Sequence, residues 1–197
     1  MSLILFQSAG GFLVLPDRAS LLVSRENGGN LVINPPRPVW ERSELSASEL
    51  TAFACLVAAA GRAMIDELPQ LAGGCVNYWE AGNWALNDEA EPRGRKDART
   101  YRQMHLHLLG RSPTSTDPAW AWGESPRFPM FAERLTWAAR FERLSMAECA
   151  AIVGRTDALL RGQYAPAAGE IAGWSLCERC GYPSLALPCG ECASGLR

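Results

Sequence analysis

The sequence lacks a strong net charge, a long apolar run and, almost entirely, histidine. Its 19 basic and 21 acidic residues give a formal charge of −2, which argues against a general electrostatic attraction to nucleic acid. There is no run of about 18 apolar residues, and the start of the chain lacks the basic and apolar regions of a signal peptide. We therefore expect a cytoplasmic protein with no membrane partner.

Apolar residues are plentiful. They make up 48% of the 197 residues, so a sizeable core can form and disorder is not the expected main state. A chain of this length accommodates one domain of ordinary size and an appendage.

The only two histidines lie two residues apart in the segment 102–111. In a β-strand alternate side chains share a face, so Gln103, His105 and His107 would line one face. The opposite, apolar face would hold Met104, Leu106 and Leu108. Three interpretations stay open: a half-buried strand facing solvent, a metal pair that needs a third ligand, or nucleophilic catalysis by an imidazole. The surrounding chain favours catalysis.

Residues 103–111 resemble the signature strand of the histidine triad (HIT) nucleotide hydrolases and transferases. That signature is His-x-His-x-His followed by apolar residues, and Gln103 stands in place of the first histidine, as in a bacterial branch of the family. Residues 29–38 resemble the family's Gly-His-x-Leu-Val-x-Pro strand, with Asn30 in place of its histidine. Segments 44–50 and 117–120 are similar to the start of the family's helix and to a tail found in that branch. The resemblance covers roughly residues 10–125, and the order of its pieces is more specific than any one of them.

The resemblance implies an enzyme that cleaves at the α-phosphate of a nucleoside phosphoanhydride or phosphoramidate. His105 would attack the phosphorus and form a nucleotidyl-histidine, while His107 would stay beside the phosphate. Gln103 would replace the first imidazole, keeping a hydrogen bond but losing a titratable group, and Asn30 would replace the upstream histidine. The partner would be an adenylated or guanylated small molecule, and no catalytic metal is required.

Further substrate contacts are implied at three places. Gly82 and Asn83 look like the family's turn that approaches the substrate phosphate, although an ordinary Gly-Asn loop is an equal alternative. Arg111 and Ser24 are weaker candidates for phosphate or ribose contacts, and both also fit plain surface positions. The charged insertion 87–100 is either a solvated loop or a flap that reaches substrate phosphate.

Four cysteines near the end of the chain form a CxxC…CxxC pair: Cys177, Cys180, Cys189 and Cys192. Two such thiolate pairs complete a tetrahedral site, so we expect a structural zinc that supplies the folding energy of a small ribbon-like module.

The expected fold is α+β: a HIT-like antiparallel sheet of about five strands with a long helix over residues 47–68, followed by C-terminal helices and the zinc-ribbon-like module. Ser46 and Ser145 should open helices through capping boxes. Residues 19–24 are expected to form a strand that turns back at 26–29. We divide the chain into a catalytic domain (1–125), a helical extension (126–168) and the zinc module (169–197).

Two other functions compete with catalysis. A weakened triad beside a zinc module also suits a nucleotide-sensing adaptor. Removal of AMP from nucleic-acid ends ranks last, because the cysteine segment carries more acid than base apart from Arg197. HIT proteins commonly form homodimers, and the resemblance implies the same here.

Overall fold

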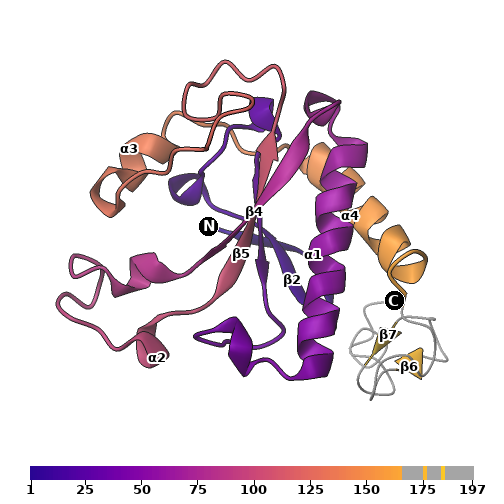
Figure 1. The fold of residues 1–197 in the computed structure, drawn as a ribbon, viewed down its shortest axis with the longest axis horizontal. Coiled ribbons are helices and arrows are strands. Elements are labelled where there is room, and N and C mark those ends of the chain that lie inside the picture. The colour runs from indigo at the N-terminus through magenta and orange to yellow at the C-terminus, as the bar shows by residue number, and fades with distance from the viewer. Residues whose placement is uncertain (166–174, 177–182, 185–197) are drawn as a thin grey trace.

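An antiparallel five-stranded sheet is the centre of the computed structural model, which describes residues 1–165, 175–176 and 183–184 (Figure 1). The strand order is β1-β2-β3-β5-β4. The strands are β1 (Leu3–Ser8), β2 (Gly11–Leu15), β3 (Asn30–Asn34), β4 (Cys75–Ala81) and β5 (His105–Arg111). The helices are α1 (Ala47–Glu67), α2 (Ala98–Tyr101), α3 (Arg134–Ala138) and α4 (Met146–Arg161). The prediction of a mixed α+β fold with such a sheet and a long helix is confirmed. A separate short pair consists of β6 (Ser175–Leu176) and β7 (Pro183–Ser184).

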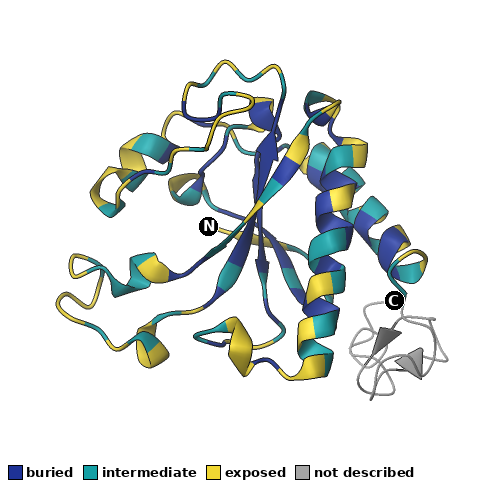
Figure 2. Cartoon of the chain, in the orientation of Figure 1, coloured by how far each residue is buried: buried dark blue, intermediate teal, exposed yellow. Residues whose placement is uncertain are grey.

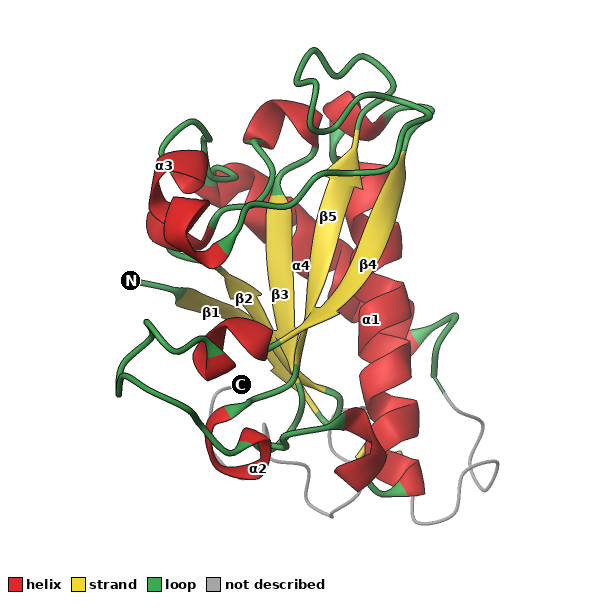
Figure 3. Cartoon of the chain, turned by 60° about the vertical axis from the view of Figure 1, so that its left-hand side comes forward, coloured by secondary structure: helices red, strands yellow, loops and turns green. Residues whose placement is uncertain are grey.

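Helices α1 and α4 cover one face of the sheet, whereas α2, α3 and the long loops lie on the other side (Figure 3). The main core lies between the sheet and α1, and it includes Leu31, Ile33, Leu108, Phe53 and Leu56. Colouring by burial shows the middle of the sheet as the most enclosed part of the fold (Figure 2). The opposite sheet face is therefore available for a site.

The predicted capping box at the start of α1 is confirmed. Ser46 Oγ accepts a hydrogen bond from the Glu49 backbone N–H at 3.3 Å, and the Glu49 carboxylate accepts one from the Ser46 N–H at 2.8 Å. The guanidinium of Arg37 also donates a hydrogen bond to Glu49 and lowers the pKa of that carboxyl to about 2.

Helix α1 is long and apolar enough to cross a membrane by length and composition alone. The sequence did not indicate this, because its apolar residues form no uninterrupted run. In this structure the apolar stripe of α1 packs in the core.

The second capping box is also confirmed, at Ser145 and Glu148, and it opens α4. Helix α4 packs along α1 and contributes Cys149 and Ile152 to the same core as the sheet. The first of the C-terminal helices is short, because a 3₁₀ turn occupies Phe131–Glu133 and α3 covers only Arg134–Ala138. In the part of the chain that the structure describes, the helical extension thus shares the core of the sheet domain.

The prediction of a strand over residues 19–24 is wrong. Arg18–Ser20 and Arg25–Asn27 form 3₁₀ turns, and β3 pairs with β2 instead. The physical reason is that Leu21, Leu22 and Val23 are all buried, in two small clusters with Trp120 and Phe141 among their members. The expected turn also differs, because positive φ angles fall on Gly28 and Gly29 and not on Asn27.

Gly110 lets strand β5 approach the turn before β3. A Cβ atom at this position would lie 2.5 Å from Gly28 Cα and 2.6 Å from Asn27 O. Both neighbours are backbone atoms, so a side chain here must displace one of the two segments.

We expect Gly110→Ala to lower the free energy of unfolding by about 3 kcal/mol, the upper range for overpacking a dense region. Gly154→Ala is the matched control, because Gly154 lies in α4 and an added Cβ there would meet nothing within 4 Å. It should raise stability by about 0.5–1 kcal/mol. Urea unfolding of both variants measures this, and equal effects would contradict the close approach.

Candidate functional site

Strand β5 presents its two histidines on the sheet face opposite α1. The apolar alternates Leu106 and Leu108 point into the main core, so the odd-numbered side chains face the other way. The register places Trp79 of β4 and Val32 of β3 on either side of His107. The predicted division of this strand into a polar and an apolar face is therefore present.

A cavity of about 580 Å³ opens on this face, and we call it the histidine cavity. Gln103, His105 and His107 line it together, although Gln103 precedes the first residue of β5. Its volume lies in the range of about 300–1,000 Å³ that small-molecule sites occupy. Three aromatic side chains complete its walls: Trp79, Trp84 and Tyr101.

The tautomer of His105 follows from its hydrogen bond. Its Nδ1 lies 3.0 Å from the backbone oxygen of Gln103. A carbonyl oxygen only accepts, so Nδ1 carries the proton and the lone pair is on Nε2. Burial lowers the pKa of His105, and the nearby positive charge of Arg102 lowers it further, against the opposing effect of the Gln103 bond. The ring is therefore neutral near pH 7 and has an unprotonated nitrogen.

His107 is the more enclosed of the two rings, with 7% of its surface exposed. Its ring is stacked with Trp79 at a centroid distance of 5.3 Å and lies 5.0 Å from the ring of His105. Burial, together with the adjacent His105, lowers the pKa of His107 to about 3. Its Nδ1 is buried and has no hydrogen-bond partner among the described residues. An unpaired buried nitrogen costs about 1–3 kcal/mol, which a ligand donor or acceptor could offset.

Gly82 and Asn83 lie at the histidine cavity, where the sequence placed them. Gly82 has a φ of 131°, and a Cβ there would lie 2.7 Å from the Gln103 oxygen. Only glycine therefore fits this turn beside the histidine strand. Asn83 Oδ1 accepts a hydrogen bond from Arg102 Nε at 3.0 Å, which fixes the side chain at the rim.

Arg102 organises the rim of the cavity, and sequence reasoning missed it. Its guanidinium donates to the Trp40 oxygen and to Glu41, and it forms a 3.8 Å ion pair with Glu80. Arg42 Nε also donates to Glu80 at 2.7 Å. Glu80 is the charged residue among those that line the histidine cavity, and these two arginines offset its charge. Because Glu80 pairs with Leu106, its side chain leaves the sheet on the face opposite the histidines. No local sequence pattern could have revealed this network, because its members come from distant segments.

The aromatic walls were also missed, along with Ser20 and Leu22. The alternation of the 75–79 strand could have indicated Trp79, once that strand was paired with the histidine strand. Trp84 and Ser20 lie in 3₁₀ turns, whose positions depend on tertiary packing.

Three predicted contact residues are not brought to the cavity lining. Asn30 is buried, and its Oδ1 accepts a hydrogen bond from the Leu22 N–H at 3.1 Å, so it supports the wall from behind. Ser24 Oγ accepts from the Glu142 N–H at 3.4 Å, away from the lining. Arg111 ends β5, roughly 20 Å from His105 at about 3.3 Å per strand residue, and lines a different cavity. Arg111 is not a plain surface residue, because the arginine is buried at the far end of the strand, away from the histidine cavity. A contact between Arg111 and a phosphate or ribose stays a prediction.

The charged loop before β5 does not place its cations on the cavity lining. Arg93 pairs with Glu91, Lys96 donates to the Asn87 and Gly94 oxygens, and Arg99 lies over the Trp40 ring. The loop contributes Tyr101 instead, at the end of α2. The four cysteines predicted to bind zinc lie outside the described residues.

Comparison with known proteins adds no assignment. No protein-family model matches the chain, and no curated protein is similar to it.

Because both rings are kept neutral by burial, we expect stability to fall as the pH decreases below 6.5. The unfolded chain binds protons at its ordinary histidine pKa, whereas folded His107 stays unprotonated to about pH 3. His107 alone should cost about 2 kcal/mol between pH 7 and pH 5, and His105 adds to the same trend.

Urea unfolding between pH 5 and 7.5 measures this trend. The stability that the carboxyls of Glu49 and Glu148 contribute is lost at lower pH, between their ordinary pKa of 4.5 and their folded pKa of about 2. His107→Leu should remove most of the pH dependence. A variant slope equal to that of the wild type would contradict a neutral buried ring.

Proposed function

We propose that the protein is a nucleotidyl hydrolase or transferase that cleaves at the α-phosphate of a nucleoside phosphoanhydride or phosphoramidate through a nucleotidyl-His105 intermediate. The observation that carries the proposal is the His105 ring, whose Nδ1 donates to the Gln103 oxygen while its Nε2 keeps a lone pair at a cavity. This is the state in which an imidazole acts as a nucleophile.

The same hydrogen bond supports the intermediate. Attack of Nε2 on phosphorus forms the N–P bond, breaks the bond to the leaving group and leaves His105 positively charged. The Gln103 oxygen already accepts a hydrogen bond from Nδ1–H, so it stabilises this charge without rearrangement. Attack by water or another acceptor then breaks the N–P bond and restores the neutral ring.

Neutral groups would receive the phosphate. Besides the histidines, the polar lining includes Gln103, Asn83 and Ser20, and the negative charge of Glu80 is offset by Arg42 and Arg102. Hydrogen-bond donors in a water-poor cavity can stabilise developing phosphoryl charge strongly. His107 lies one strand repeat further along β5, close enough to His105 to contact the same phosphate.

Aromatic rings suit the base of a nucleotide. Trp84 and Tyr101 line the cavity from two short helical segments that contact each other, whereas Trp79 packs on His107. Base–aromatic stacking contributes about 1–3 kcal/mol and tolerates different bases. The lining therefore accommodates either adenine or guanine.

The structural zinc of the cysteine segment, homodimer formation and a cytoplasmic location remain predictions from the sequence. They are not needed for the chemistry proposed at His105.

The test is the intact mass of the protein after brief incubation with a panel of adenylated and guanylated compounds. Wild type should gain the mass of one nucleotidyl group, and His105→Ala should not. Turnover of the reactive compound should fall by at least about 10³-fold in the variant, because the nucleophile is lost.

Arg95→Ala is the matched control, since this exposed loop residue is absent from the cavity lining. It should form the adduct at the wild-type rate. Tight nucleotide binding with neither adduct nor product in wild type would contradict catalysis and favour the sensing function, with Gln103 and Asn30 as the substitutions that removed activity.

A further inference from the structure

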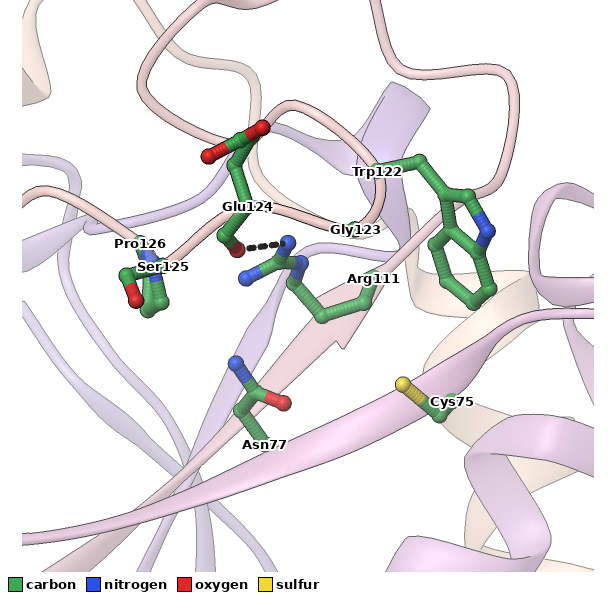
Figure 4. A pocket seen from close by; sticks show the side chains of 8 residues that line it. All are labelled: Cys75, Asn77, Arg111, Trp122, Gly123, Glu124, Ser125 and Pro126. Carbon is green, nitrogen blue, oxygen red and sulfur yellow. Dashed lines mark hydrogen bonds between the residues drawn. The ribbon is translucent and has the colours of Figure 1, made fainter.

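A second cavity, of about 500 Å³, lies at the opposite end of β5 (Figure 4). Arg111, Asn77 and Cys75 line it from the two paired strands, and Trp122 and Glu124 line it from the loop above. We call it the Arg111 cavity. Its strand residues share the sheet face of the histidines, because Cys75 pairs with Arg111 and Trp79 with His107.

Arg111 is unusual among the charged residues of the described chain, because only 5% of its surface is exposed and it forms no ion pair with a described acid. Its described hydrogen bonds use one nitrogen, Nη2, which donates to the Ala121 and Glu124 backbone oxygens at 2.8 Å each. Its Nε is buried without a partner among the described residues. The Glu124 carboxylate points away from the guanidinium (Figure 4).

Such a group is costly without a counter-charge. Removing a cation from water costs several kcal/mol, and two carbonyl dipoles with one ring contact, to Trp120 at 5.7 Å, offset this only in part. Arginine presents its donors in a planar fork that matches the oxygens of a carboxylate or phosphate. A cavity lined by a guanidinium without a counter-charge is suited to an oxyanion.

We propose that the Arg111 cavity is a binding site for a small oxyanion, a carboxylate or phosphoryl group, distinct from the histidine cavity. Arg111 supplies the charge, and the Asn77 amide, which points toward the guanidinium, supplies a further hydrogen bond (Figure 4). Trp122 is 46% exposed and offers a flat apolar surface for the remainder of the ligand. This site is independent of the function proposed at His105.

The test uses inorganic phosphate and benzoate as separate probes, followed by the NMR signal of the Arg111 Nε–H group. Arg111→Lys identifies that signal by its loss. We expect a saturable shift with phosphate, with benzoate or with both at millimolar concentrations. Saturation with phosphate alone identifies a phosphoryl ligand, whereas saturation with benzoate shows that a carboxylate next to an aromatic ring is accepted.

Asn77→Asp provides the decisive variant, because it places a permanent carboxylate beside Arg111. Affinity for either probe should fall at least about tenfold, since the guanidinium then has an internal partner. The melting temperature should stay equal or rise, which separates this effect from misfolding. Asn87→Asp is the matched control, because it adds the same charge at a loop residue that is absent from the lining of this cavity, and it should keep affinity within about threefold.

Two results would overturn the proposal. One is the absence of a saturable shift with both probes. The other is an unchanged affinity in Asn77→Asp, which would show that the observed binding occurs elsewhere.

Discussion

The strict alternation of β5 is the constraint on which the rest of this structure depends. Leu106 and Leu108 are packed into the core with α1, and burial of each contributes about 2 kcal/mol. A slip of one residue would move both histidines into that core and both leucines onto the site face. Because β5 is paired on both sides, by β3 and β4, the slip would also break two ladders. The apolar face thus fixes the position of the polar one.

Electroneutrality characterises the histidine cavity. Burial lowers the pKa of both imidazoles, so both are neutral near pH 7, and the carboxylate of the one charged lining residue, Glu80, pairs with Arg42 and Arg102. A protonated His105 could not attack phosphorus, so burial serves the proposed chemistry directly. The same burial makes the folded state less stable in acid, and the two effects have a single cause. Neutral donors also avoid the strong ground-state attraction that a cation would give a phosphate.

The sequence predicted the features of the fold and site that depend on residues close together in the chain, and it missed those that depend on contacts between distant segments. The capping boxes at Ser46 and Ser145 and the faces of β5 were predictable, because each depends on residues within one short segment. Gly82 and Asn83 were found by resemblance, and their turn is fixed by its contact with Gln103. The conformation of residues 19–24 was not predictable. A short apolar run that buries Leu22 outside the sheet has the same sequence pattern as a strand. The rim network of Arg102 joins residues 40–42 and 80–83 to residue 102, so no local pattern encodes it.

Arg111 shows that the alternation of a strand predicts the face on which a side chain lies but not how far that side chain is buried. The register of β5 puts Arg111 on the histidine face, but its burial depends on the loop 121–124, whose carbonyls accept from its guanidinium. Between the two cavities lie apolar groups: Leu109, Trp79 and Phe128, with the last two rings 4.3 Å apart. These groups cannot pair with a phosphate chain, so one polyphosphate extending from His105 to Arg111 would leave its charges unmet. The two ends of the strand are therefore suited to separate oxyanions, one received by neutral donors and the other by a buried cation.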